Sequence, residues 1–143
     1  MACAYGEGVE GARTSSLPDS AVELIDRPVI AAFTTLRPDG TPHTTPVWIG
    51  RDGDELLVNT ASGRVKARNV ERDPRVAVCL VDPLDPLNVV ALEGTVVDVT
   101  TQGADELIDA LSLKYTGNPT FGAREPGRHR LTLRIRCDRL LLA

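Results

Sequence analysis

Two Asp-Gly dipeptides between strand-like runs constrain the fold of this chain more than any other feature. The first, Asp39-Gly40, lies between residues 29–36 (VIAAFTTL) and residues 42–49 (PHTTPVWI). The second, Asp52-Gly53, leads into residues 55–60 (ELLVNT). An Asp-Gly pair in so short a gap is a strong signal for a β-hairpin. The pattern therefore predicts a three-stranded antiparallel meander.

The rest of the chain adds further strand-like and helix-like segments. Strands are expected at residues 75–82, 88–100, 130–136 and 138–142, with a bend or bulge at Gly94 and a stiff proline-containing connector at residues 82–86. Helices are expected from Pro18 to before Pro28, over residues 61–73 with Ser62 as the cap, and over residues 103–115. Six or seven mostly antiparallel strands with short helices predict a mainly β fold, a small β-barrel.

Length and composition point to one domain. The chain has 143 residues, 42% of them apolar, which is enough to bury a core. Residues 1–16 have no apolar period and are expected to be a mobile leader, so that residues 17–143 form the domain. Gly6, Gly8 and Gly11 spell G-x-G-x-x-G, but no strand precedes them and two glutamates would repel a pyrophosphate. We therefore expect no dinucleotide site there.

Cysteine usage and hydropathy indicate a compartment. Cys3, Cys79 and Cys137 are odd in number and widely spaced, which favours reduced core thiols over a disulfide framework or a metal site. No apolar run approaches the roughly 20 residues that cross a bilayer, and no signal-peptide pattern opens the chain. The sequence thus predicts a cytoplasmic protein that does not bind a membrane.

The positive charges are concentrated in two segments of an otherwise acidic chain. The net charge is -4, yet five cations face two acids from Arg64 to Arg75, and six arginines face two acids from Arg124 to Arg139. Nucleic-acid binding would need a broadly basic surface with interleaved aromatics, and only five aromatics are present. A small polyanionic ligand fits two local clusters better. The alternative is that these arginines bind no ligand. They would then only form a solvent-exposed helix face and prevent an edge strand from pairing with another chain.

The first basic segment has the pattern of a phosphate site. A predicted strand ends at Thr60, a predicted helix begins near Ser62, and Arg64 and Lys66 lie in its first turns. A helix N-terminus offers unsatisfied N–H groups and partial positive charge, which favour a phosphate. Arginine adds a bidentate fork and lysine a point charge, so the two together can hold one phosphate.

The same segment carries a family resemblance. Residues 60–78 read T-x-S-G-R-V-K-A-R-N-V-E-R-D-P-R-V-A-V, preceded by D-G-T-P-H-T-T-P-V-W and followed by E-G-T-V at residues 93–96. From about residue 17 to the C-terminus the chain resembles the split β-barrel flavin and deazaflavin oxidoreductases, a superfamily that includes the pyridoxamine 5'-phosphate oxidase-like proteins. It most resembles the branch that uses the deazaflavin coenzyme F420.

The resemblance implies a set of cofactor ligands around the basic helix. Arg64 and Lys66 match the positions that bind the cofactor phosphate, with Thr60 and Ser62 beside them as hydroxyl donors. Asn69 matches the asparagine that ends the R-x-K-x-R-N run and lies close to the cofactor.

It also implies contacts to the ring and a second subunit. Thr45, Pro46 and Val47 match the strand whose backbone follows the tricyclic ring. Asn88 matches a segment that reaches the cofactor from the partner subunit of a homodimer, often through an aromatic or an arginine. The asparagine is a departure from that pattern and leaves the substrate class open.

The implied function is hydride transfer from reduced F420 to a small electron-poor organic substrate such as an enone or a conjugated imine. No side chain stands out as the proton donor, and solvent would suffice. The six arginines from Arg124 to Arg139 could accompany the long anionic tail of F420. His43 could orient the substrate or be a surface residue, and Trp48 could line the cofactor site or pack in the core or a dimer interface.

Two other functions fit the same residues. The fold could hold FMN, as an oxidase or a reductase, because the phosphate site is common to both cofactors. The protein could also bind a flavin or F420 without turnover. A pyridoxamine phosphate oxidase proper is less favoured, since the C-terminal segment shows no second phosphate site for that substrate.

Overall fold

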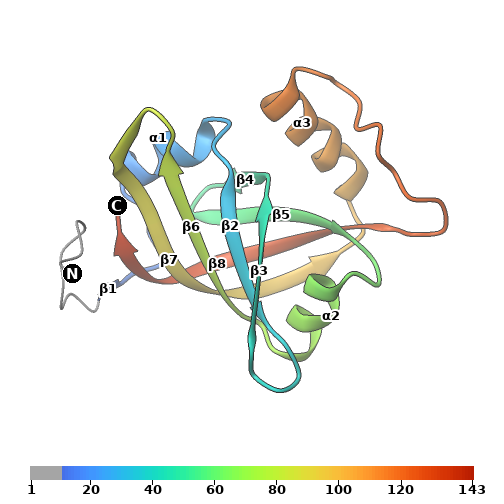
Figure 1. Cartoon of the computed structure of the whole chain (residues 1–143), viewed down its shortest axis with the longest axis horizontal. Coiled ribbons are helices and arrows are strands. Elements are labelled where there is room, and N and C mark those ends of the chain that lie inside the picture. Colours follow the sequence, from blue (N-terminus) through green and yellow to red (C-terminus); the bar gives the residue numbers. More distant parts are fainter. Residues whose placement is uncertain (1–10) are drawn as a thin grey trace.

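A strongly curled antiparallel sheet makes up most of the computed structural model, which describes residues 11–143 (Figure 1). Its strands are β1 (Ala12–Arg13), β2 (Ala31–Leu36), β3 (Pro42–Val47), β4 (Ile49–Asp52), β5 (Glu55–Ala61), β6 (Arg75–Asp82), β7 (Asp85–Thr100) and β8 (Arg130–Leu142). They are ordered β3-β2-β6-β7-β8-β5-β4, with β1 beside β8. Three helices, α1 (Asp19–Asp26), α2 (Val65–Arg72) and α3 (Ala104–Thr116), complete the split barrel that the sequence predicted.

The sheet turns a corner at Trp48. Strands β3 and β4 are separated by this one residue in the sequence, yet they stand at opposite ends of the strand order. Both predicted hairpins form, but the expected continuous strand 42–49 and the three-stranded meander are wrong. The amide of Ile49 donates to the hydroxyl of Tyr115 at 3.1 Å, and the Trp48 ring stacks on the Tyr115 ring. Tertiary contacts to α3 thus replace strand pairing at this point.

Side chains that point to the inner face of the curled sheet build the core. On β8 the side chains of Leu131, Leu133, Ile135 and Cys137 are buried, as is Thr132 between the first two. Helix α1 covers one end of the sheet with Ala21, Leu24 and Ile25, all with no exposed surface. Burying each such Leu or Ile contributes about 1.5–3 kcal/mol.

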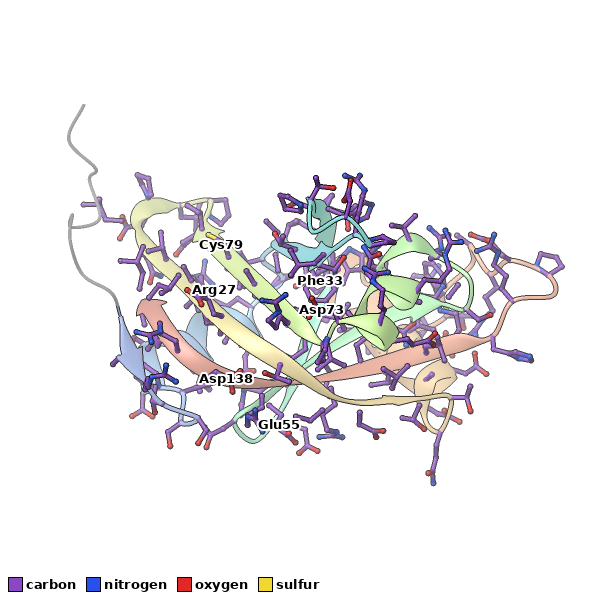
Figure 2. The ribbon with its side chains drawn as sticks, turned by 90° about the horizontal axis from the view of Figure 1, so that it is seen from below. Arg27, Phe33, Glu55, Asp73, Cys79 and Asp138 are labelled. Atoms are coloured by element: carbon purple, nitrogen blue, oxygen red, sulfur yellow. The ribbon has the colours of Figure 1, made fainter. Side chains whose placement is uncertain are left out.

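The cysteine prediction holds for one of the two described residues. Cys137 is a free thiol in the core, whereas Cys79 is a free thiol exposed on β6 (Figure 2). Its neighbours Val78 and Leu80 point inward, so alternation places Cys79 outward despite its apolar surroundings in the sequence. Cys3 lies outside the described residues.

Two other expectations about the strands are wrong. The predicted connector at residues 82–86 is a tight β6–β7 hairpin, in which the Asp82 carboxylate accepts bonds from the Arg27 guanidinium and the Leu84 amide. The predicted strands 130–136 and 138–142 are one strand, β8. The irregularity at Gly94 is confirmed by a register shift between Glu93 and Gly94 against β8.

The described part of the predicted leader is also structured. Ala12 and Arg13 form β1 and pair with Leu140 and Arg139 of β8. Residues 12–13 of the predicted leader thus extend the sheet, while the boundary of the domain at residue 17 stays a prediction. The first two glycines of the G-x-G-x-x-G run lie outside the described residues.

Among residues 11–143, no helix is both long and apolar enough to cross a bilayer. The same residues contain no group of three His, Cys, Asp or Glu side chains arranged to hold a metal ion.

Candidate cofactor site

A pocket of about 330 Å³ lies where the corner at Trp48, the end of β5, the start of α2 and one side of α3 meet. Its lining divides into a polar, cationic end and an apolar wall. The polar end consists of Asn59, Thr60, Arg64, Lys66 and Arg130. The apolar wall consists of Ile30, Pro46, Val47, Trp48, Ile108, Leu111 and Phe121. None of the lining residues is acidic.

Lys66 is the most informative cation of this pocket. Burial lowers the pKa of its ammonium group, and the neighbouring charges of Arg64 and Arg130 lower it further. Within residues 11–143 its ammonium makes no ion pair, whereas Arg64 pairs with Glu125. A half-buried positive charge beside two others is costly unless an anion joins it. The polar end could therefore accommodate an anionic group.

The start of α2 supplies uncharged donors at the same place. The first intrahelical bond runs from the Arg68 amide to the Arg64 carbonyl at 3.1 Å, so the amides of residues 65–67 have no acceptor in the helix. No side chain caps this end. The Thr60 hydroxyl is buried without a hydrogen-bond partner. These orphaned donors, together with Lys66, fit the phosphate of a cofactor.

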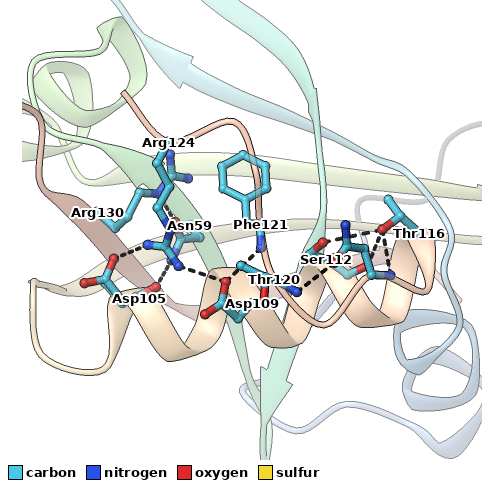
Figure 3. A network of polar contacts seen from close by, with 11 residues as sticks. Asn59, Asp105, Asp109, Ser112, Thr116, Thr120, Phe121, Arg124 and Arg130 are labelled. Atoms are coloured by element: carbon cyan, nitrogen blue, oxygen red, sulfur yellow. Dashed lines mark hydrogen bonds and ion pairs between the residues drawn. The ribbon is translucent and has the colours of Figure 1, made fainter. Parts of the chain in front are cut away.

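Arg130 and Asn59 complete the polar end, and the sequence did not single out either of them. The Nε–H of Arg130 donates to Oδ1 of Asn59 at 2.8 Å, and Nδ2 of Asn59 donates to the Ala104 carbonyl at 2.7 Å (Figure 3). Burial lowers the pKa of Arg130, and the charges of Arg64 and Arg124 add to this. Arg130 lies in the alternating run of β8, where only strand register shows that it sits opposite the end of β5.

The other arginines of the second basic segment do not form one surface. Arg124 pairs with Asp105 and Asp109, Arg134 with Asp52 and Glu55, and Arg136 with Asp138. Of the six, only Arg128 and Arg130 line a pocket next to Lys66. The idea that all six accompany one anionic tail is therefore wrong, because Arg124, Arg134 and Arg136 pair with carboxylates and the six are spread over the loop before β8 and the length of β8 itself.

The apolar wall is built on aromatic contacts. Trp48 stacks on Tyr115, with ring centroids 5.5 Å apart and an interplanar angle of 10°. It also meets Phe121 edge to face, with centroids 5.9 Å apart at 82°. Trp48 thus lines the pocket, whereas its packing in a dimer interface stays a prediction.

A second pocket, of about 410 Å³, shares Arg64 and Lys66 with the first. It is also lined by His43, Thr45 and Arg128. Nδ1 of His43 and the hydroxyl of Thr45 are buried here without a partner. Polar groups in need of a partner thus lie on both sides of Lys66.

The predicted cofactor residues fall into two groups. Thr45, Pro46, Val47, Thr60, Arg64 and Lys66 line these two pockets. Ser62, Asn69 and Asn88 line neither. Their contact to a cofactor stays a prediction, as does that of the first group.

Each of the three outlying residues has a partner within the chain. Ser62 does not cap α2, since its Oγ accepts the His129 amide at 3.0 Å. Asn69 is buried and donates to the Thr35 hydroxyl at 2.9 Å, which ties α2 to β2. Asn88 donates to Asp82 at 3.0 Å in the β6–β7 hairpin.

Three solved structures resemble this chain over most of its length. A protein named F420 Reductase matches with a TM-score of 0.77 and 27% identity, over 87% of this chain and 98% of that one. General Stress Protein 26 of Bacillus anthracis matches with a TM-score of 0.60 and 20% identity, over 87% and 97%. The conserved hypothetical protein Rv2991 of Mycobacterium tuberculosis matches with a TM-score of 0.59 and 23% identity, over 90% and 89%. The similarity to General Stress Protein 26 and to Rv2991 shows a shared fold alone.

A family model provides the assignment. The model described as pyridoxamine 5'-phosphate oxidase matches residues 17–138, from just before α1 almost to the end of β8. That span contains strands β2 to β7, most of β8 and all residues that line the two pockets. The chain belongs to the pyridoxamine 5'-phosphate oxidase family.

Proposed function

We propose that this protein is an F420-dependent oxidoreductase that reduces a small, electron-poor organic substrate. The observation that carries the proposal is the pocket in which an anion site and an aromatic wall face the same space. A cofactor with a phosphate and a flat ring needs both features. The likeness to a protein named F420 Reductase supports the deazaflavin over other cofactors.

The residues of the polar end would hold the phosphate. Arg64 and Lys66 would bind it from two sides, and the Thr60 hydroxyl would donate a hydrogen bond that the protein itself does not use. Arg64 would exchange its ion pair with Glu125 for the phosphate or share the two. Charge-assisted bonds of this kind contribute about 1.5–3 kcal/mol each.

The apolar wall would position the ring and exclude water from it. Trp48 and Phe121 offer flat apolar surfaces, and α3 adds Ile108 and Leu111. The chemistry that reduced F420 would supply when bound is a hydride from C5 to the electron-poor carbon of the acceptor, and solvent would supply the proton. The lining contains no carboxyl, imidazole or thiol, and its one ammonium group, that of Lys66, is assigned to the phosphate, so no side chain of this pocket is assigned as the proton donor.

The proposal includes a homodimer. Ile30 and Val81 are about half exposed, and Leu84 and Leu87 are exposed by 85% and 68%. Ile30 and Val81 line a further pocket of about 370 Å³ over β2, β3 and β6, together with Pro46, which also lines the cofactor pocket. A second copy that covered this face would bury the apolar residues and lie next to the site.

The second candidate is the same fold with FMN. The anion site serves either cofactor, and the family supports a flavin as well. The two cofactors differ in their reaction with oxygen, because a reduced deazaflavin barely reacts with it whereas reduced FMN forms peroxide.

Turnover under air separates these candidates. Purified protein is mixed with reduced F420 and cyclohexenone, and F420 oxidation, enone reduction and peroxide are followed together. We expect one enone reduced for each F420 oxidised, with little peroxide. Peroxide formation with FMN and no enone reduction with F420 would favour the flavin oxidase. Tight F420 binding without any turnover, across a panel of enones and imines, would indicate a binding protein.

A further inference from the structure

The connection between α3 and β8, residues 117–129, places one aromatic side chain in the wall of the pocket. Most of these residues are exposed, whereas Phe121 is half-buried and contacts the Trp48 ring edge to face. The guanidinium of Arg130 lies 5.3 Å from the centroid of the Phe121 ring. Phe121 is therefore the point at which an exposed loop shapes the apolar end of the cofactor site.

One carboxylate on α3 holds this part of the loop. Oδ1 of Asp109 accepts the backbone amide of Phe121 at 2.9 Å and Nη2 of Arg124 at 2.8 Å (Figure 3). Asp105, one turn earlier, also pairs with Arg124 but makes no bond to Phe121. Within the described residues no backbone carbonyl accepts the Phe121 amide. Asp109 is thus the hydrogen-bonding partner that fixes the backbone from which the Phe121 ring projects.

We propose that Phe121 is the specificity-determining residue at the apolar end of the pocket and that Asp109 is the positioning residue that acts through it. The ring closes the space beside Trp48, so it admits a flat, narrow acceptor and excludes one with bulky substituents. With Phe121 displaced, the wall would retract and larger acceptors would enter. The identity of the acceptor rests on the proposed function, whereas the position of the wall does not.

The position of the wall can be measured without any ligand. Trp48 is the only tryptophan of the chain, so its fluorescence reports on the pocket directly. Acrylamide quenching is compared for wild type, Phe121→Ala, Asp109→Ala, Asp109→Asn and Asp105→Ala. Asp109→Asn keeps an acceptor for the Phe121 amide, and Asp105→Ala removes an ion pair of Arg124 without touching Phe121. Circular dichroism confirms that each variant is folded.

We expect quenching to rise in Phe121→Ala and Asp109→Ala and to stay near the wild-type value in Asp109→Asn and Asp105→Ala. Equal quenching in Asp109→Ala and Asp105→Ala would overturn the role of Asp109. Unchanged quenching in Phe121→Ala would overturn the role of Phe121.

Selectivity gives the functional readout. The kcat/KM values for cyclohexenone and for a ring-substituted, bulkier enone are compared in the same variants. The ratio of bulky to small substrate should rise roughly tenfold or more in Phe121→Ala and Asp109→Ala, mainly through a lower KM for the bulky enone. Asp105→Ala should keep the wild-type ratio, and a ratio unchanged in Phe121→Ala would contradict the proposal. If no variant reduces any enone, the proposed function fails, while the quenching series still decides the position of the wall.

Discussion

The Nε–H of Arg130 donates to Oδ1 of Asn59 at 2.8 Å, so a neutral amide orients the guanidinium beside Lys66. Asn59 is itself held by the Ala104 carbonyl at the start of α3. An amide partner directs the cation without neutralising it, unlike the carboxylates that pair with Arg134 and Arg136. The charge of Arg130 therefore remains available to a ligand in the pocket.

Arg130→Ala should weaken the binding of a phosphate-bearing cofactor by roughly ten- to a hundredfold, because one charge-assisted contact contributes about 1.5–3 kcal/mol. The affinity is measured by fluorescence titration at fixed ionic strength. Arg136→Ala is the matched control, since Arg136 lies on the same strand but is half-exposed and pairs with Asp138. Equal losses in the two variants would mean that only the overall charge of β8 matters.

Anion affinity should fall at alkaline pH earlier than an ordinary lysine predicts. Burial and two neighbouring arginines lower the pKa of Lys66 below the usual value of about 10.4. Only the protonated ammonium attracts a phosphate, so affinity is full below the lowered pKa and declines as pH rises through it. A bound anion raises that pKa, so binding takes up protons in this window, which calorimetry in buffers of different ionisation enthalpy detects. In Lys66→Arg this decline in anion affinity should disappear. If the decline persists in that variant, a group other than Lys66 causes it.

Tyr115→Phe should destabilise the fold at the corner of the sheet. The Tyr115 hydroxyl donates to the Val29 carbonyl at 2.6 Å and accepts the Ile49 amide at 3.1 Å. Its loss leaves these backbone groups unpaired, at a cost of about 1–3 kcal/mol in the free energy of unfolding. Urea denaturation measures the change. Thr34→Val, which removes the exposed hydroxyl pair of Thr34 and Thr44, should stay within about 0.5 kcal/mol of wild type.

Val81→Arg should disrupt the proposed dimer. Val81 is 46% exposed on the apolar face over β2, β3 and β6, where a buried arginine without a partner would be strongly unfavourable. Leu113→Arg is the matched control, because Leu113 is 54% exposed on α3, away from that face. Sedimentation velocity at micromolar concentration should show a dimer for wild type and the control and a monomer for Val81→Arg. A wild-type monomer that binds cofactor would contradict a site shared between subunits.

Local signals in the sequence were sufficient to predict much of the fold. Each Asp-Gly pair marks a hairpin because its turn conformation is encoded in the dipeptide itself, and Gly40 and Gly53 both adopt positive φ. The cluster of Thr60, Arg64 and Lys66 was also predictable, since the three residues lie within seven positions at one strand-to-helix junction. Such features depend on neighbours in the chain.

Features that depend on distant partners could not be predicted in the same way. The break at Trp48 arises from Tyr115, which is far along the sequence. Ser62 pairs with His129, just beyond the paired ends of β5 and β8, instead of capping α2. Arg130 reaches the pocket only through the register of β5 and β8. Cys79 is exposed because alternation on β6 decides its side, not the apolar residues around it.

Titrating F420 and FMN separately into wild type and Lys66→Ala tests the proposed cofactor site most directly. Arg68→Ala is the control, because Arg68 is exposed on the same helix and lines neither pocket. We predict that wild type and Arg68→Ala bind F420 more tightly than FMN, and that Lys66→Ala loses roughly ten- to a hundredfold in affinity for both. Submicromolar FMN binding with no measurable F420 affinity would contradict the deazaflavin assignment, and unchanged affinity in Lys66→Ala and in the Arg64→Ala/Lys66→Ala double variant would contradict the phosphate site itself.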